Sequence, residues 1–121
     1  MSIYQEIILD HYQYPHNHGH LTEPNYKTKV NNPLCGDEIE MEVNISNNQV
    51  EQISFFGHGC AISQASASIL TDFVKGKSVS ELQNLQKDSI MNLLGIELSP
   101  NRLKCALISL EALHKLLKEC K

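Results

Sequence analysis

The alternating stretch Glu38-Ile39-Glu40-Met41-Glu42-Val43-Asn44-Ile45 decides the fold class of this 121-residue chain. An apolar residue at every second position predicts a strand with one face against a core and the other, carrying the glutamates, in water. Asn47 and Asn48 follow, and asparagine tolerates the left-handed backbone of a tight hairpin. The next run, 50–56, is therefore expected to return antiparallel, and an earlier strand near 27–31 would complete a small sheet.

The sequence on both sides of these strands has helical spacing. Segment 2–14 has isoleucines at helical intervals and ends ahead of Pro15, which disfavours helix in the preceding residue. Small and apolar residues over 61–75 predict a helix that stops at Gly76. Leucines that repeat over 100–119 predict a long, amphipathic C-terminal helix.

Two short helices are expected between the long ones. Ser78 and Glu81 have capping-box spacing and should open a helix through about Gln86. Asp88 should cap another helix over 90–94. Strands that come first and helices that follow predict an α+β fold.

Composition narrows the class of protein further. At 121 residues, with 41% hydrophobic and 20% charged residues, the chain is expected to fold as one domain over 1–121. No apolar run approaches the roughly 20 residues that cross a bilayer, and the N terminus lacks a signal pattern, which predicts a cytoplasmic protein without membrane contact. A net charge of −4 and scattered basic residues argue against nucleic-acid binding.

Three of the four cysteines fall at junctions between the predicted elements. Cys35 precedes the long strand, Cys60 stands where the last strand meets a helix, and Cys105 lies in the first turns of the final helix. Gly36 frees the backbone so that Cys35 and Asp37 can face one point. Without an export signal the thiols should stay reduced, which favours metal binding or catalysis over disulfides.

The chemistry of these side chains suits a metal centre. A helix N terminus behind Cys60, and the charges of Arg102 and Lys104 beside Cys105, favour thiolate. Three thiolates and the Asp37 carboxylate can complete a tetrahedral zinc site, although thiolate-rich sites also hold iron–sulfur clusters. A carboxylate among thiolates is the ligand most easily displaced, which favours a site that opens over a purely structural one.

Other candidate ligands have simpler interpretations. His16, His18 and His20 alternate as if to clasp a metal, but their neighbours predict a solvated surface loop. His58 is either a second-sphere hydrogen-bond donor or an ordinary turn histidine. Cys120 lies outside any motif and is assigned no role.

Three motifs, supported by an N-terminal segment, resemble the NifU N-terminal domain family, to which IscU and SufU belong. They are Asn32-Pro33-Leu34-Cys35-Gly36-Asp37, Gly59-Cys60-Ala61-Ile62-Ser63-Gln64-Ala65-Ser66-Ala67-Ser68, Arg102-Leu103-Lys104-Cys105-Ala106 and the segment that begins Asp10-His11-Tyr12. The resemblance implies a SufE/NifU-like fold, in which helices cover one face of a three-stranded antiparallel sheet. It also implies that the positions of Cys35, Asp37, Cys60 and Cys105 form the metal site.

The sequence combines features that resemble SufU with features that resemble IscU. The serine-rich stretch after Cys60, and Lys104 before Cys105, resemble SufU, whose members bind zinc and accept persulfide sulfur from a cysteine desulfurase. IscU usually has histidine at the position of Lys104, and a Leu-Pro-Pro-Val-Lys segment where this chain reads Leu98-Ser99-Pro100-Asn101-Arg102. The short interval between Cys60 and Cys105 is, however, similar to IscU, because SufU typically carries an insertion there.

The resemblance implies a role in iron–sulfur cluster assembly. The favoured hypothesis is a zinc-dependent acceptor of persulfide sulfur, acting as a sulfurtransferase with a cysteine desulfurase of the SufS or IscS type. Cys35 is the expected sulfur acceptor, with Arg102 and Lys104 in support. The alternatives are an IscU-like scaffold that builds a [2Fe–2S] cluster and passes it to downstream assembly or apo-acceptor proteins, and a structural zinc-binding interaction domain.

Overall fold

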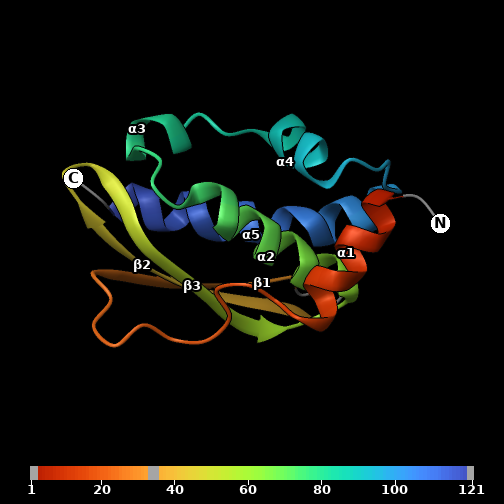
Figure 1. Cartoon of the computed structure of the whole chain (residues 1–121), viewed down its shortest axis with the longest axis horizontal. Coiled ribbons are helices and arrows are strands. Elements are labelled where there is room, and N and C mark those ends of the chain that lie inside the picture. Colours follow the sequence, from red (N-terminus) through yellow and green to blue (C-terminus); the bar gives the residue numbers. More distant parts are fainter. Residues whose placement is uncertain (1–2, 33–35, 120–121) are drawn as a thin grey trace.

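A layer of helices covers one face of a three-stranded antiparallel sheet in the computed structural model, which describes residues 3–32 and 36–119 (Figure 1). The strands lie in the order β1-β2-β3, with bounds Tyr26–Asn32, Asp37–Ser46 and Gln49–His58. The helices are α1 Ile3–Gln13, α2 Ala61–Val74, α3 Val79–Leu82, α4 Lys87–Leu94 and α5 Pro100–Glu119. The predicted α+β class is confirmed.

The central strand β2 has the predicted two-residue period. Ile39, Met41 and Val43 are fully buried, while the glutamates between them are partly exposed. Asn47 and Asn48 have φ values of 53° and 62°, the left-handed conformation that a tight hairpin requires. Strand β3 therefore returns antiparallel to β2, as the sequence predicted.

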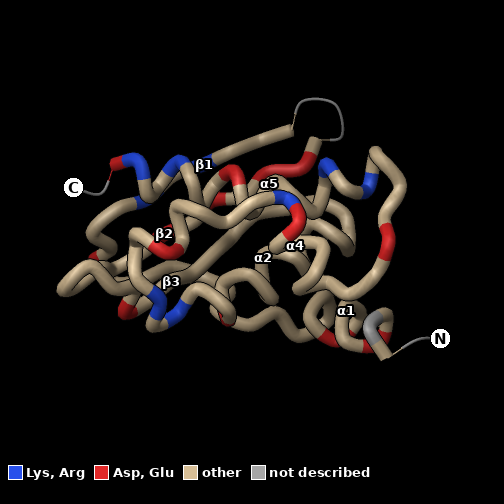
Figure 2. Tube along the Cα trace, turned by 90° about the horizontal axis from the view of Figure 1, so that it is seen from above, with Lys and Arg blue, Asp and Glu red and all other residues tan. Residues whose placement is uncertain are grey.

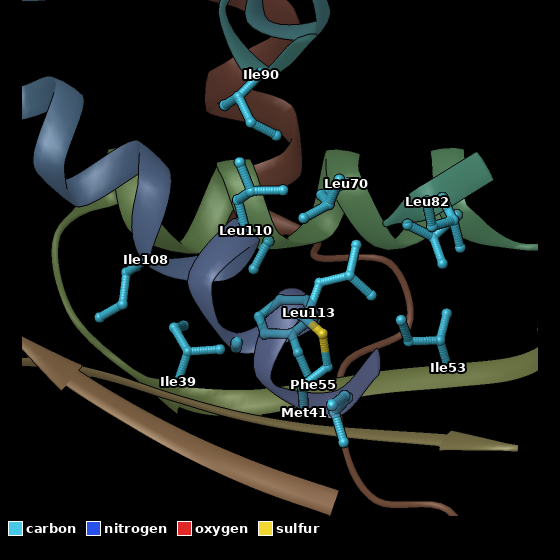
Figure 3. Close-up of a cluster of buried hydrophobic side chains, with 14 of the residues drawn as sticks. Ile39, Met41, Ile53, Phe55, Leu70, Leu82, Ile90, Ile108, Leu110 and Leu113 are labelled. Carbon is cyan, nitrogen blue, oxygen red and sulfur yellow. The ribbon is translucent and has the colours of Figure 1, made fainter. Parts of the chain in front are cut away.

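The core lies between the sheet and two long helices. Helix α5 packs on β1 and β2, and α2 packs on β3. Figure 3 shows Ile39, Met41 and Phe55 from the sheet facing Leu70 of α2 and Leu113 of α5. Burying such side chains contributes roughly 1.5–3 kcal/mol each.

The two short helices differ from the prediction at their ends. Ser78 does cap α3, accepting from Glu81 N–H at 3.1 Å, but α3 ends at Leu82 and does not continue to Gln86. Gln86 is instead the N-cap residue of α4, and its N–H donates to Ser89 Oγ at 3.3 Å. The prediction that Asp88 caps α4 was therefore wrong, because Asp88 already lies in the first turn.

The segment between α1 and β1 lies along the outer edge of β3. Gly19 N–H donates to Phe55 O at 2.8 Å, and Phe55 N–H donates to Asn17 O at 2.9 Å. The rings of His18 and His20 lie 5.5 and 5.0 Å from the ring of Phe56. His16, His18 and His20 are exposed, as expected for a solvated surface loop. The loop also covers a strand edge that would otherwise be open to pairing.

Charged residues of both signs are dispersed over several elements, as Figure 2 shows. None of the helices within the described residues combines the length and the apolar character needed to cross a bilayer.

Glu42 fastens the loop to the sheet, which gives the fold a testable dependence on pH. Its carboxylate accepts from Leu21 N–H at 2.7 Å and lies 3.1 Å from His20 Nδ1. Burial acts to raise the pKa of Glu42, but these two hydrogen bonds and the charges of His20 and Lys27 outweigh it and lower the pKa. The resulting stability is present above the ordinary glutamate pKa and is lost as the pH falls through the lowered value.

We expect Glu42→Gln to lower the free energy of unfolding by about 1 kcal/mol at pH 7. The difference from the wild type should shrink to nothing in acid, which urea unfolding at a series of pH values would measure. Glu51→Gln, at an exposed position of β3, is the control. A deficit that stayed constant from neutral pH to acid would contradict the role given to the Glu42 charge.

Candidate metal centre

Three separate elements bring Asp37, Cys60 and Cys105 to one point. Asp37 opens β2, Cys60 lies between β3 and α2, and Cys105 lies on the second turn of α5. One carboxylate oxygen and the two Sγ atoms all lie within 4.8 Å of one another. The start of β2 meets the end of β3 because the two strands are antiparallel, and α5 crosses the sheet at the same end.

Asp37 is held inward by the turn that precedes it. Gly36 has a φ of 76°, and its N–H donates to Asn32 O at 2.8 Å, so that β2 starts directly opposite Asn32. The Asp37 side chain is buried, with the residue only 3% exposed. Its Oδ1 accepts from Cys60 N–H at 3.2 Å, which partly satisfies the buried carboxylate.

Cys60 is the N-cap residue of α2. Its Sγ accepts from Ser63 N–H at 3.4 Å, and the Ser63 hydroxyl donates back to Cys60 O at 3.0 Å. The Cys60 thiol also lies 3.7 Å from Asp37 Oδ2. The sulfur therefore faces both the N–H groups that a helix start leaves unpaired and the candidate carboxylate ligand.

Gly59 and Ser63 support this geometry, although neither was predicted from the sequence to be a site residue. A Cβ atom on Gly59 would lie 2.4 Å from Ser63 Oγ and 2.7 Å from Asp37 Oδ1, so only glycine leaves room for both side chains. The signal for Ser63 was its position three residues after Cys60, which is the capping interval. The close approach at Gly59 has no local signal, because Asp37 is remote in sequence.

A groove of about 740 Å³ opens beside the two described cysteines. Cys60 and Cys105 line it together with Arg102 and Lys104, both exposed, and with α1 residues that include Leu9. The predicted supporting side chains therefore lie at the mouth of the candidate site. Both described cysteines therefore line an open groove.

The sequence also drew attention to Cys35, Cys120 and His58, which are not among the three ligand residues just described. Cys35, the predicted fourth ligand and sulfur acceptor, lies outside the described residues, as does Cys120. His58 ends β3, is exposed and pairs across the strands with Glu38. It does not belong to the group of ligand atoms formed by Asp37, Cys60 and Cys105.

The three described side chains fit a tetrahedral metal ion. Zinc bonds of roughly 2.3 Å to sulfur and 2.0 Å to oxygen place neighbouring ligand atoms roughly 3.5–3.8 Å apart. The 3.7 Å between Cys60 Sγ and Asp37 Oδ2 has this length. Small side-chain rotations would bring the remaining pairs, now within 4.8 Å, to the same separation. Three protein ligands leave a fourth position for another thiolate.

Comparison with known proteins gives matches over nearly the whole chain. The model of the NifU-like N terminal domain matches residues 3–121. The zinc-dependent sulfurtransferase SufU of Bacillus subtilis is 36% identical, and the match covers 94% of this chain and 88% of the relative. The iron–sulfur cluster assembly scaffold protein IscU of Streptococcus pyogenes is 33% identical, with 96% and 83% covered.

A solved structure agrees with these relatives. A candidate iron–sulfur cluster assembly scaffold protein for the SUF system, from Fervidobacterium islandicum, superimposes with a TM-score of 0.79 and 26% identity, covering 93% of this chain and 94% of that one. The alignments to the Bacillus and Streptococcus proteins run over 131 and 133 positions, more than the 121 residues of this chain. Both relatives therefore carry residues that this chain lacks.

Proposed function

Because this chain belongs to the NifU-like N-terminal domain family, we propose that it acts in iron–sulfur cluster assembly as a zinc-dependent acceptor of persulfide sulfur. The observation that carries the proposal is the convergence of Asp37, Cys60 and Cys105, with the two cysteines lining an open groove. Similarity to the zinc-dependent sulfurtransferase SufU supports zinc as the metal and sulfur transfer as the reaction.

Each residue of the site has a proposed task. Asp37, Cys60 and Cys105 hold the metal, and Cys35 is the fourth ligand and the sulfur acceptor. Bound zinc supplies positive charge that keeps its sulfur ligands deprotonated. The exposed Arg102 offsets the negative charge that three thiolates and a carboxylate bring together.

The proposed transfer moves one sulfur atom from a cysteine desulfurase to Cys35. The Cys35 thiolate attacks the outer sulfur of the partner's cysteine persulfide, forming a new S–S bond. The partner's own S–S bond breaks, and its cysteine leaves as a thiolate, so no external oxidant or reductant is needed. Lys104, exposed beside Cys105, stabilises negative charge near the exchanging sulfurs.

The test measures metal content and the rate of cysteine turnover by a cysteine desulfurase. The purified wild type is expected to be colourless, to hold one zinc ion and to accelerate the desulfurase. Cys35→Ala should leave the desulfurase at its unassisted rate, because no thiolate receives the persulfide sulfur. Cys120→Ala, which removes the cysteine outside the motifs, is the matched control and should accelerate turnover normally. Full acceleration by Cys35→Ala would refute the proposal.

A cluster scaffold is the second candidate function. It is favoured by the similarity to the scaffold protein IscU and by a thiol-rich site open to solvent, where a [2Fe–2S] cluster could form as cargo for apo-acceptor proteins. Anaerobic incubation with iron, sulfide and a desulfurase distinguishes the two: a stable, coloured cluster supports the scaffold. If neither activity occurs and zinc removal only unfolds the chain, the site is a structural one.

A further inference from the structure

A second group of metal-binding side chains lies at the far end of α2 from Cys60. It consists of His11 in the last turn of α1, His16 in the following loop and Asp72 in the last turn of α2. One ligand atom from each lies within 4.8 Å of the other two. Cys60 and Asp72 are twelve residues apart, which is roughly 18 Å along a helix. The two groups are therefore separate sites.

Hydrogen bonds from neighbouring residues hold the two histidines in place. His16 Nδ1 lies 2.5 Å from Asp72 Oδ2, and the rings of His11 and His16 are 4.4 Å apart. Ser68 Oγ lies 2.7 Å from His11 Nδ1 and accepts from His16 N–H at 2.8 Å. Nδ1 of His11 thus has Ser68 as its hydrogen-bond partner. Outer hydrogen bonds of this kind orient metal-binding imidazoles.

Asp72 is oriented in the same way from the other side. Asn17 Nδ2 donates to Asp72 Oδ1 at 2.9 Å and to Thr71 Oγ1 at 3.0 Å. Asn17 itself has a left-handed backbone, with a φ of 59°, which directs the loop back toward α2. One carboxylate oxygen is thus engaged by Asn17, and the other faces the histidines.

The protonation states also suit a cation. Burial lowers the pKa of His11, and the positive charge on His16 lowers it further. Burial acts to raise the pKa of Asp72, but hydrogen bonds from His16 and Asn17 outweigh it and lower the pKa. Both shifts are in the direction of the forms that bind metal, a neutral imidazole and an ionised carboxylate.

We propose that His11, His16 and Asp72 form a second, solvent-accessible site for a divalent transition-metal ion. Two imidazoles and one carboxylate suit ions such as Ni²⁺, Co²⁺, Cu²⁺ and Zn²⁺, and they leave positions open to water. The side chains of His16 and Asp72 are 48% and 42% exposed, so they can separate by the roughly 0.5 Å that a bridging ion needs. The ion would join α1 and its loop to α2.

The test titrates Ni²⁺ into the full chain loaded with one equivalent of zinc and no excess, so that the second site stays open, and follows binding by calorimetry. We expect binding of one equivalent of Ni²⁺ and a rise in the unfolding temperature, because an ion that binds only the folded state stabilises it. His16→Asn and Asp72→Asn should each weaken Ni²⁺ binding more than about tenfold. His20→Asn, which changes a histidine of the same loop that faces Glu42, is the matched control and should bind like the wild type.

Co²⁺ provides a readout that distinguishes this site from the cysteine site. Co²⁺ bound to His11, His16 and Asp72 should give weak visible absorption without the intense near-ultraviolet bands of cobalt–thiolate bonds. Absence of a Ni²⁺ equivalent in the zinc-loaded chain would overturn the proposal, as would an equivalent that survives both His16→Asn and Asp72→Asn. If circular dichroism shows that one of these two variants fails to fold, Ni²⁺ binding by the other variant tests the proposal. The outcome is independent of sulfur transfer, because the cysteines remain unchanged.

Discussion

Cys60→Ser is expected to lose zinc while keeping the fold. Serine oxygen is a preferred N-cap acceptor, so it can replace Sγ in accepting from Ser63 N–H and keep the start of α2 in place. A neutral hydroxyl does not replace a thiolate ligand. Since even changes around metal ligands reduce affinity about 10- to 100-fold, loss of a ligand should reduce zinc affinity more than about 100-fold. Competition with a chromophoric chelator measures this.

Cys60→Ala separates the two tasks of this side chain. It should lose zinc to the same extent, and its metal-free form should also be destabilised by about 1 kcal/mol, because alanine offers no cap. Urea unfolding of the metal-free proteins gives that difference. Wild-type zinc affinity in Cys60→Ser would remove Cys60 from the ligand set.

Gly57→Ala is expected to damage the sheet itself. Gly57 pairs with Ile39 across β3 and β2, and a Cβ atom there would lie 2.0 Å from Glu38 O and 2.9 Å from Glu38 C. Both are backbone atoms of the paired strand, so relief requires the strands to separate. We expect a loss of roughly 2–4 kcal/mol, a large share of the roughly 5–15 kcal/mol that holds a typical domain folded. Thermal and urea unfolding measure it.

Gly76→Ala is the matched control for Gly57→Ala. Both glycines have a positive φ, 157° at Gly57 and 80° at Gly76, but a Cβ added at Gly76 would meet no atom within 4 Å. It should therefore lose only about 1–2 kcal/mol, from backbone strain alone. Equal losses in the two variants would show that the contact with Glu38 is unimportant. Zinc binding by Gly57→Ala should weaken as well, because Asp37 and Cys60 lie at the ends of the two strands that separate.

Local sequence patterns predicted most of the helices and strands, because the residues that determine each of them lie close together in the chain. The alternation around Met41 is a property of eight consecutive residues, and it gave the buried face of β2 correctly. The start of α3 at Ser78 depends on residues three positions apart. The start of α4 was misplaced because Gln86, an uncommon N-cap residue, occupies the position for which Asp88 was the stronger candidate.

The candidate metal centre could be predicted because its residues lie at junctions between helices and strands, and such junctions can be located from the sequence. Asp37, Cys60 and Cys105 were grouped because each lies where an element begins, and functional side chains gather at such places. The partners of His16 could not be found in this way. Asp72 lies 56 residues away and contacts it only because α1 packs against α2, a contact that no local pattern encodes.

The position of Cys60 as the N-cap residue of α2 couples metal binding to formation of the helix start. An ion bound by its sulfur favours the conformation in which the helix start is formed, and by reciprocity a formed helix start favours the ion by the same free energy. Neither ion binding nor formation of the helix start therefore needs to come first. Removal of such an ion would loosen the first turn of α2, so loss of the metal and mobility of this turn are two aspects of one process.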